Sequence, residues 1–470
     1  MVQRRKRLPP PFLIAVALFG ALLVFGFFYA PRVVDVSPAP NSPTTPSGAA
    51  ISLTFSRPMD QVSVETRLAI IPEVAGTIEW QGNSLIFTPG RPWPPGEEVS
   101  VRLAAGARAK SFLPLLGARG WAFTVAKPRL VYLSLAEGHA DLHVRFVESE
   151  NDQRLTTTAQ GVLAYTVGPK AVSLIYAAAG DQGASEIRAL GLVDLEDTRV
   201  YACPAGYRCL APSVSPDGKL LAFEQHQLNS GAAGEWMVGL GHVYVLPLHG
   251  SGEARLVGPA DHFAVQPFWS PDGTLALYDQ TRKAFVLYNV GGGIQDRMLQ
   301  IIPNELGSGT AWSPDGAFLV APEMLFRSAQ AAVGEAPAIF YSHLYRTQVS
   351  TGAIVDLSAG ATGLVEDASP AFSPDGRWIA FGRKPLDEGQ WTPGRQLWLM
   401  RSDGSESRQL LEDPEYNHFA FAWSPDSARI AFVRADPMDR TQPTEIWSIE
   451  VSSGARRKIV EGGSLPHWLP

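Results

Sequence analysis

Five aspartates recur from residue 217 onward, and carboxylates repeated in one pattern could bind calcium or act as general acids and bases. Each follows a Ser-Pro pair, and in four copies a glycine comes next: the aspartates are Asp217, Asp272, Asp315, Asp375 and Asp426. In Ser-Pro-Asp-Gly the proline presets φ at the first central position of a tight turn, and the aspartate side chain caps the turn. We therefore assign these aspartates to turns and expect no metal site there.

Two histidines lie beside polar residues in the segments between repeats. His262 follows Asp261, and His418 lies close to Glu415 and Tyr416. If such side chains converged within hydrogen-bonding distance, they could serve a lyase or a hydrolase as acid and base. The sequence contains no Gly-x-Ser-x-Gly nucleophile elbow, no His-Glu-x-x-His and no glycine-rich phosphate loop. We therefore expect a protein that is not an enzyme and that carries no cofactor, with an enzyme as the alternative.

The only two cysteines are Cys203 and Cys209, and they flank a short segment that contains proline and glycine. This spacing fits a small loop closed by a disulfide in an oxidising compartment. It does not suit a metal site, because no further cysteine could complete a set of four ligands. We predict a structural disulfide, with two free thiols as the alternative.

The Ser-Pro-Asp-Gly turns belong to a longer repeat. A short apolar run such as Leu220–Phe223 or Ile379–Phe381 follows the turn. A second apolar segment comes next, as at Leu397–Met400, and a third follows a polar turn, as at Arg408–Leu410. Apolar segments separated by turn residues are typical of strands, and repeats of this length are typical of arrays in which each unit packs on the next. Each unit is predicted to be the four-stranded blade of a β-propeller.

The two ends of the repeat region are predicted to share one blade. Pro466–Pro470 repeats the pattern of Pro267–Pro271, and three strand-like segments begin the region: Leu130–Leu133, Leu142–Arg145 and Arg154–Thr156. A C-terminal strand that joins these three would close the ring and remove its free edges. This gives seven blades, or six if the degenerate first copy at Val167–Lys170 does not form.

These repeats resemble WD-like propeller repeats such as those of the Tol translocation protein TolB. They also resemble the propeller repeats of prolyl-oligopeptidase-type peptidases. The resemblance covers residues 128–470 and rests on five motif copies in register. It implies a propeller but says little about function, because propellers host both binding and catalysis.

Residues 31–127 are predicted to form a separate β-sandwich. The strand candidates are Ile51–Phe55, Thr77–Trp80, Ser84–Phe87, Val99–Leu103 and Trp121–Val125. Many short strands in so short a segment favour a sandwich. The segments Phe55–Asp60, Phe87–Pro89, Pro95–Val101 and Trp121–Thr124 resemble the bacterial Ig-like domain of S-layer proteins such as SbsA, where it serves as a spacer or adhesive module.

The N-terminus is predicted to be a membrane anchor. The basic residues Arg4–Arg7 precede an uncharged apolar run over residues 12–30. At about 1.5 Å per residue, this run would extend roughly 28 Å as a helix and could cross a bilayer. The basic flank would keep residues 1–11 in the cytoplasm and place the rest outside, in the cell envelope. A cleaved signal peptide is the alternative.

Composition excludes one class of partner. The net charge is −7, and the sequence has no basic cluster beyond the N-terminus. Nucleic acid is not an expected partner, because phosphate binding needs a concentrated basic surface. With 44 Gly, 38 Pro and little helical periodicity beyond residue 30, the chain is predicted to be all-β.

Four long insertions indicate a functional face. They lie between the second and third strands of their repeats, at residues 225–241, 327–342, 384–395 and 434–444. Because successive hairpin turns alternate faces, the insertions should emerge together with the blade-to-blade connections, opposite the Ser-Pro-Asp-Gly turns. Loops that tolerate insertion often carry binding function. The candidate binding residues on this insertion-bearing face are Asp261, His262, Glu305, Glu366, Asp367, Tyr416 and His418.

The sequence thus predicts a membrane-anchored, all-β protein with an Ig-like sandwich and a seven-bladed propeller, which recognises a protein, peptide or glycan without catalysis. A lyase or hydrolase with its site in the channel mouth is one alternative. A structural or adhesive surface protein is the other.

Overall fold

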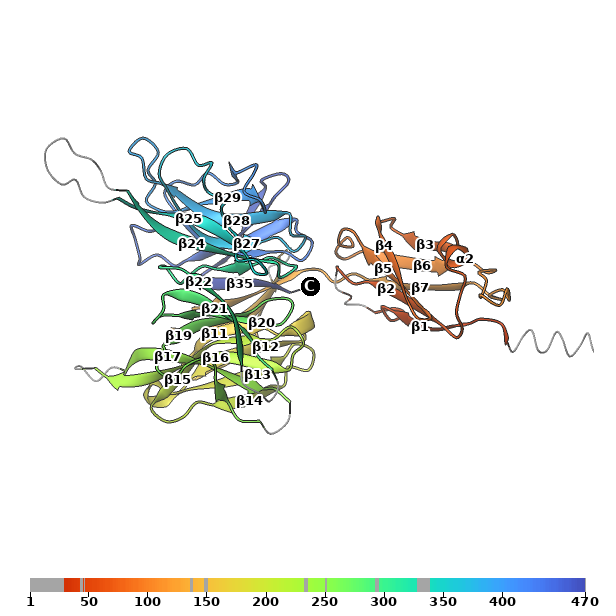
Figure 1. Cartoon of the computed structure of the whole chain (residues 1–470), viewed down its shortest axis with the longest axis horizontal. Helices are drawn as coiled ribbons and strands as arrows, with labels where there is room; N and C mark the ends of the chain where they lie inside the picture. Colours follow the sequence, from red (N-terminus) through yellow and green to blue (C-terminus); the bar gives the residue numbers. More distant parts are fainter. Residues whose placement is uncertain are drawn as a thin grey trace, which may run out of the picture. The chain divides into compact units, whose positions relative to one another are not determined.

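The structure, a computed structural model, describes residues 29–42, 45, 47–135, 138–147, 151–231, 236–249, 252–291, 296–327 and 339–469. Strands make up nearly all of its regular structure (Figure 1). The chain divides into two compact units, and the boundary in the sequence falls between Lys127 and Pro128.

In its described residues the first unit has two antiparallel sheets and one short helix. One sheet has the order β1-β2-β5-β4 and the other the order β3-β6-β7. The elements are β1 (Val33–Ser37), β2 (Ile51–Phe55), α2 (Gln61–Glu65), β3 (Leu68–Ile71), β4 (Gly76–Gln81), β5 (Ser84–Pro89), β6 (Glu98–Leu103) and β7 (Arg119–Thr124). Residues of one parity in β2 are fully buried, as the alternation of side chains along a strand requires, and they pack with Trp93 and Phe123 into one core.

The predicted membrane anchor is corrected by the structure. Among the described residues no helix is long and apolar enough to cross a membrane, and α2 has only five residues. Residues 12–28 of the predicted anchor, and the cytoplasmic segment 1–11, lie outside the described residues. The single-pass location that we predicted from the sequence is therefore not supported.

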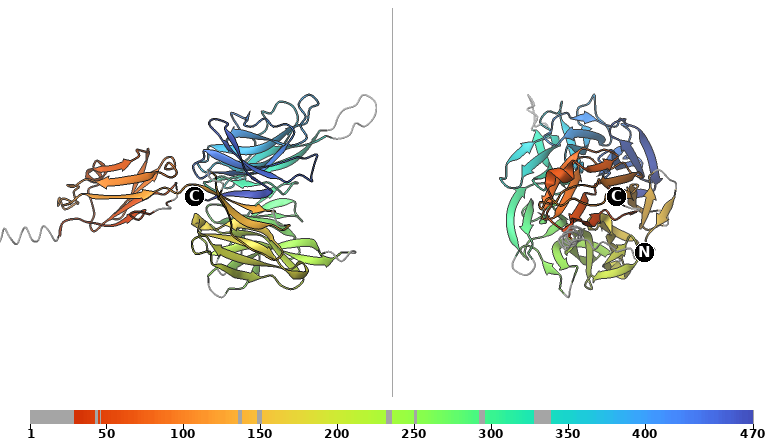
Figure 2. Two further views of the ribbon diagram at one scale, coloured as in Figure 1. Left: turned by 180° about the vertical axis from the view of Figure 1, so that it is seen from behind. Right: turned by 90° about the vertical axis from the view of Figure 1, so that its right-hand side faces the viewer.

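The second unit consists of seven groups of four antiparallel strands, called sheets 1 to 7. They follow one another around a ring in chain order (Figure 2). Sheets 1 to 3 are β11 (Val162–Val167), β12 (Ser173–Ala179), β13 (Ser185–Gly191), β14 (Asp197–Ala202); β15 (Tyr207–Val214), β16 (Leu220–Ser230), β17 (Trp236–Pro247), β18 (Arg255–Leu256); and β19 (Ala264–Trp269), β20 (Thr274–Asp279), β21 (Ala284–Asn289), β22 (Arg297–Pro303). Two short 3-10 helices lie in connections between strands of sheet 1: Pro169–Ala171 between β11 and β12, and Asp181–Gly183 between β12 and β13.

Sheets 4 to 6 are β23 (Ala311–Trp312), β24 (Phe318–Arg327), β25 (Ile339–Gln348), β26 (Ile354–Asp356); β27 (Val365–Phe372), β28 (Trp378–Pro385), β29 (Gln396–Arg401), β30 (Arg408–Gln409); and β31 (Asn417–Trp423), β32 (Arg429–Ala435), β33 (Glu445–Glu450), β34 (Arg456–Glu461). Sheets 4 and 5 are also joined by one parallel bridge between Ser342 and Glu366.

Sheet 7 combines the two ends of the unit. The C-terminal strand β35 (Gly463–Leu469) pairs with β8 (Arg129–Ser134), which continues to β9 (Asp141–Phe146) and β10 (Asp152–Arg154). The sequence predicted this pairing. β35 is the edge strand of this sheet and is hydrogen-bonded to β8 on one side.

The repeated aspartates cap turns. In the first copy Ser215 Oγ donates to Asp217 Oδ1 (2.7 Å), which also accepts from the backbone N–H of Lys219 (3.1 Å). Gly218 takes a left-handed φ of 73°, and Ser427 adopts φ 57° in the copy that lacks glycine. Among the described residues no three His, Cys, Asp or Glu side chains are grouped as metal ligands.

Tryptophans at the ends of innermost strands link neighbouring sheets. The indole N–H of Trp269 donates to the Ser213 carbonyl (3.0 Å), and that of Trp423 donates to the Ala371 carbonyl (2.9 Å). Trp468 in β35 repeats the pattern, with a bond to the Ala422 carbonyl (3.0 Å). Each indole therefore buries its ring between sheets with its polar atom satisfied.

Two of the predicted insertions are extended strands. β16 and β17 continue their pairing outward to Ser230 and Trp236, and β24 and β25 continue to Arg327 and Ile339. The expected loops are thus partly long hairpins, because main-chain pairing continues wherever the partner strand is also extended.

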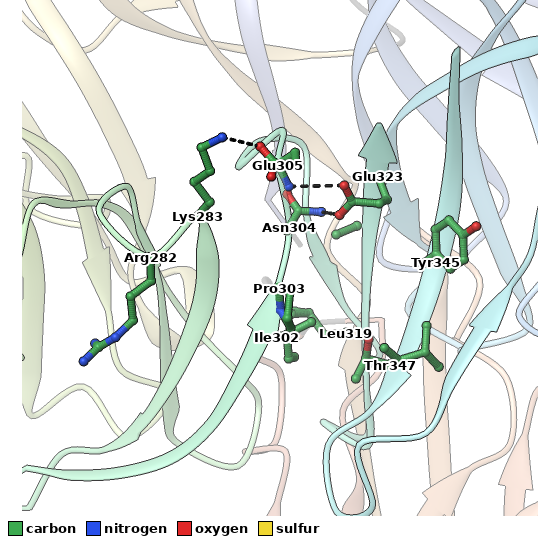
Figure 3. A pocket seen from close by; sticks show the side chains of 12 residues that line it. Arg282, Lys283, Ile302, Pro303, Asn304, Glu305, Leu319, Glu323, Tyr345 and Thr347 are labelled. Atoms are coloured by element: carbon green, nitrogen blue, oxygen red, sulfur yellow. Dashed lines mark hydrogen bonds and ion pairs between the residues drawn. The ribbon is translucent and has the colours of Figure 1, made fainter. Parts of the chain in front are cut away.

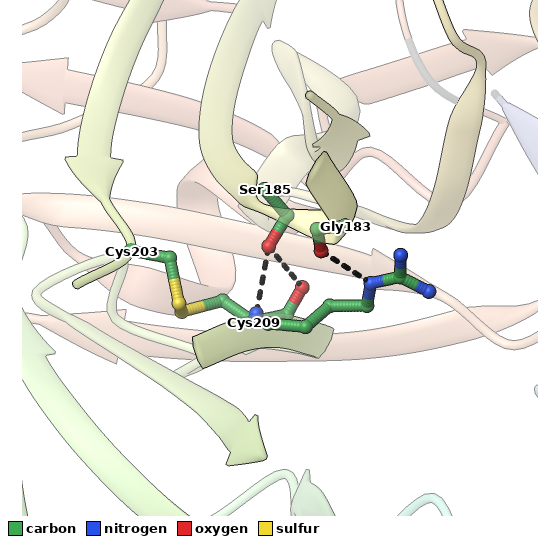
Figure 4. Close-up of a disulfide and its surroundings, with 5 residues drawn as sticks. Gly183, Ser185, Cys203 and Cys209 are labelled. Carbon is green, nitrogen blue, oxygen red and sulfur yellow. Dashed lines mark hydrogen bonds between the residues drawn. A yellow bond between two sulfur atoms is a disulfide. The ribbon is translucent and has the colours of Figure 1, made fainter. Parts of the chain in front are cut away.

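A disulfide joins Cys203, just after β14, to Cys209 in β15 (Figure 4). It connects neighbouring sheets 1 and 2. The Ser185 hydroxyl reinforces the same place, because it accepts from the Cys209 N–H (2.7 Å) and donates to the Cys209 carbonyl (3.1 Å).

Replacing both cysteines by serine is expected to lower the free energy of unfolding by about 2 kcal/mol, since a short loop is no longer closed in the unfolded chain. Urea titration of the oxidised protein measures this. Under reducing conditions the two proteins should have nearly equal midpoints. A serine variant as stable as the oxidised wild type would show that the disulfide adds nothing.

Candidate functional site

The predicted rim residues are distributed over several sheets. Asp261 is exposed in the turn before β19, and Glu305 is exposed in the connection between β22 and β23. Glu366 and Asp367 lie in β27, and Tyr416 directly precedes β31, which contains His418. The prediction treated all seven as rim residues available to a ligand, but most of them are committed to partners inside the protein.

His262 is held by an acid of its own sheet. Its Nδ1 lies 2.7 Å from Asp279 Oδ2, and the same carboxylate accepts from Arg282 Nη1 (2.9 Å). Asp279 is buried at the end of β20. His262 is therefore part of a local ion-pair cluster.

Asp367 and His418 were predicted as candidate binding residues of the rim, and in the structure each is fully buried. The Asp367 carboxylate accepts two bonds of 2.7 Å from Arg383 and one of 2.6 Å from Ser358. His418 Nδ1 accepts from the Leu397 N–H (3.2 Å), and burial lowers the pKa of His418. Neither side chain is available to a ligand.

The remaining two predicted residues also have partners. Glu366 pairs with Arg395, and the Tyr416 ring lies under the guanidinium of Arg434. Arg434 in turn donates to Asp413 (2.7 Å). Burial alone would raise the pKa of Asp413, but its closeness to His418 and its bond to Arg434 bring that pKa down to about 2. These charges stabilise the sheet ends. Within the described residues, no hydrogen bond or ion pair brings His262 and His418 together, so the acid–base pair considered from the sequence is not formed.

A cleft of about 430 Å³ lies between sheets 3 and 4 (Figure 3). This volume is in the range of small-molecule and side-chain pockets. The turn between β20 and β21 contributes Arg282 and Lys283, and the connection from β22 to β23 contributes Asn304 and Glu305, so this end of the cleft lies at the insertion-bearing face. The lining residues are Arg282, Lys283, Ile302, Pro303, Asn304, Glu305, Leu319, Ala321, Glu323, Tyr345, Thr347 and Ile354.

The cleft has an apolar floor and a hydrogen-bonded rim. At the rim Lys283 Nζ pairs with Glu305 Oε2 (2.7 Å). Asn304 donates from Nδ2 to Glu323 Oε2 (2.8 Å), and its own Oδ1 accepts from the Gly307 N–H (2.7 Å). These bonds fix the rim before any ligand arrives, and a preformed rim lowers the cost of ordering it on binding.

Tyr345 in β25 adds an aromatic ring and a hydroxyl to the cleft. Burial, and secondarily the charge of Asp356, raises the pKa of Tyr345. The hydroxyl therefore stays protonated at neutral pH and can donate a hydrogen bond.

Of the predicted residues, only Glu305 lines this cleft, and sequence reasoning missed Glu323, Tyr345 and Lys283. A signal for Glu323 was present in the repeat register. In sheets 3 and 4 the serine N–H of the Ser-Pro-Asp-Gly turn donates to the carbonyl of Thr274 or Phe318, respectively, at the start of the second strand. Asp279 lies five residues after Thr274, and Glu323 lies five residues after Phe318. The same count leads to Arg383 and Arg434 in sheets 5 and 6. A polar residue thus recurs at one position near the end of the second strand.

The arrangement is suited to binding. The twelve lining residues include no histidine and no cysteine. Apolar walls with a few fixed polar groups are typical of sites that hold a ligand in one orientation.

Three curated proteins are related in sequence. The uncharacterized protein Atu1656 of Agrobacterium fabrum is 28% identical over 55% of this chain and 80% of its own length. Dipeptidyl-peptidase 5 of Porphyromonas gingivalis is 27% identical over 32% of this chain, and the peptidase YuxL of Bacillus subtilis is 26% identical over 41%. The match spans only 20% and 24%, respectively, of these two longer proteins.

Some solved structures are similar to this chain. A puromycin hydrolase superposes with a TM-score of 0.50 at 17% identity, over 78% of this chain and 52% of that one. TolB of Acinetobacter baumannii matches 94% of this chain and 99% of its own, with a TM-score of 0.42 and 13% identity.

The prediction that the chain is not an enzyme is contradicted by these comparisons, because two of the three relatives are named peptidases. That prediction depended on the absence of familiar catalytic motifs.

The first unit matches a described family. Residues 29–125 match the bacterial Ig-like domain Big_5, in agreement with the predicted sandwich. No comparison supports the finer likeness to SbsA. Residues 29–125 are therefore similar to bacterial Ig-like domains.

Proposed function

We propose that residues 128–470 form a seven-bladed β-propeller of TolB-like repeats. We also propose that its insertion-bearing face binds peptides and that the protein takes part in peptide hydrolysis. The observation that carries this proposal is the preformed cleft between sheets 3 and 4, with its apolar floor and fixed rim. The peptidase names of two relatives support a peptide as the ligand.

The chemistry of the cleft suits a peptide. Ile302, Leu319 and Ile354 offer apolar contact to a side chain. Tyr345 and Thr347 offer hydroxyls, which can donate to or accept from main-chain groups. Binding of this kind needs no movement of the sheets, because the rim bonds already exist.

A matched pair of variants on β26 tests the cleft. Neighbouring residues of a strand point to opposite sides, and Ile354 lines the cleft whereas Val355 does not. Ile354→Trp should fill the cleft and weaken peptide binding at least about tenfold, a loss of about 1.4 kcal/mol. Val355→Trp should stay within about twofold of the wild type.

The measurement uses the full chain and a mixture of short, end-blocked, fluorescein-labelled peptides, with anisotropy for binding and mass spectrometry for cleavage. Binding that Ile354→Trp alone weakens supports the cleft as the peptide site. A wild-type chain that neither binds nor cleaves any peptide of the mixture would overturn the proposal, and so would equal binding by the two variants.

A further inference from the structure

Glu323 is a carboxylate with fixed geometry and only neutral partners. Its Oε2 accepts from Asn304 Nδ2 (2.8 Å), and its Oε1 accepts from the N–H groups of Glu305 (3.2 Å) and Met324 (3.1 Å). A carboxylate has about four acceptor positions, so one remains open on Oε2. Three bonds to neutral groups hold this charge in place but do not neutralise it.

Other acids of the insertion-bearing face have basic partners. Asp279 contacts Arg282 and His262, Asp367 contacts Arg383, and Asp413 contacts Arg434. Within the part of the chain that the structure describes, Glu323 has no Lys, Arg or His within ion-pair distance. A half-buried charge without a counter-charge is unusual because such burial costs free energy unless the charge is paired.

The basic residues of the cleft are already engaged. Lys283 pairs with Glu305 at 2.7 Å, and Arg282 pairs with Asp279 at 2.9 Å. Figure 3 shows Lys283 directed to Glu305, with Glu323 at the side toward Tyr345. His343, which lies opposite Glu323 on β25, contacts Asp356 at 2.8 Å, so none of the described basic side chains pairs with Glu323.

The surroundings of Glu323 suit a cation on an apolar stem. Leu319, Ala321 and Ile354 line the cleft as apolar surface along which methylene groups can lie. The Tyr345 ring can attract a cation through its face. A lysine or arginine side chain combines these properties.

We propose that the cleft takes a lysine or arginine side chain of a bound peptide and that Glu323 is its counter-charge. This specificity rests on the proposed peptide-binding function. The ammonium or guanidinium would form a charge-assisted hydrogen bond with the open position on Oε2. The specificity-determining residue is Glu323. Glu305 does not have this role, because its charge is already paired with Lys283.

The test uses three end-blocked, fluorescein-labelled peptides of one sequence whose central residue is lysine, norleucine or glutamate. Norleucine keeps the apolar stem of lysine and lacks its charge. The wild-type chain should bind the lysine peptide at least about tenfold more tightly than the norleucine peptide, and the glutamate peptide most weakly. In Glu323→Gln the lysine preference should fall to within about twofold, because both peptides then face a neutral side chain.

Glu406→Gln is the matched control, because it removes one carboxylate charge at a residue outside the cleft lining, paired with Arg401. It should keep the full lysine preference. Binding of the norleucine peptide by Glu323→Gln shows that this variant remains folded. Equal binding of the lysine and norleucine peptides by the wild type would overturn the inference and leave peptide binding in place. A lysine preference that survives Glu323→Gln would overturn it too, and absence of all binding would overturn the proposed function with it.

Discussion

Trp468→Ala is expected to lower the free energy of unfolding of the second unit by about 3–5 kcal/mol, as for other buried tryptophans. Trp468 is only 5% exposed and packs with Leu130, Tyr132 and Ile446. Its indole N–H also bonds the Ala422 carbonyl at 3.0 Å. The substitution therefore removes both a large apolar contact and a bond between sheets 6 and 7, at the place where the ring closes.

Trp391→Ala is the control, because Trp391 is 53% exposed on an insertion. The same chemical change there should leave the free energy of unfolding within about 0.5 kcal/mol. Urea denaturation followed by circular dichroism compares the two. Equal midpoints for both variants would show that β35 contributes little to the stability of the ring.

Local chemistry explains what the sequence predicted well. The Ser-Pro-Asp-Gly turns are stabilised by bonds within a few residues, such as that from Ser215 to Asp217, so each copy carries its own structural information. The repeat count then predicted the pairing of β35 with β8, because a chain of similar units leaves one incomplete unit at each end. The Ig-like strands followed from clear apolar alternation, as in Ile51–Phe55.

Contacts between distant residues explain what the sequence could not predict. Gln266 and Ser369 adopt left-handed φ values of 54° and 53° at bulges of innermost strands, and no glycine marks these positions. Asp367 was expected at an exposed connection, yet β27 begins before it and buries it against Arg383. Sequence spacing gives a residue's place along the chain, whereas its availability depends on which partner the neighbouring strand supplies.

The candidate site shows the same division. The insertions and the connections between repeats predicted Glu305 at a binding face. The cleft is also lined by Glu323 and Tyr345, which belong to the next sheet. These two residues come beside Glu305 only when the two sheets pack against each other. Glu323 follows Pro322 in an otherwise apolar strand, and its significance appears only beside Asn304, which bonds both its carboxylate and the Pro322 carbonyl.

Arg383→Met is expected to lower the free energy of unfolding by about 3–5 kcal/mol, because removing one partner of a buried ion pair leaves the other charge uncompensated. Asp367 is fully buried and receives two bonds of 2.7 Å from Arg383. The guanidinium also lies over the Phe381 and Trp398 rings, so methionine keeps part of the apolar contact and isolates the loss of charge.

The double variant Asp367→Leu/Arg383→Met separates charge from packing. An apolar pair of similar volume often replaces a buried ion pair at little cost, so the double variant should be more stable than Arg383→Met alone. Lys219→Met, at an exposed pair with Asp217, should leave the urea midpoint unchanged. If the double variant were instead less stable than the wild type by the full sum of the losses measured for Asp367→Leu and Arg383→Met separately, the two side chains would act independently. In that case the pair would not be the electrostatic unit that its geometry indicates, because coupled residues deviate from additivity.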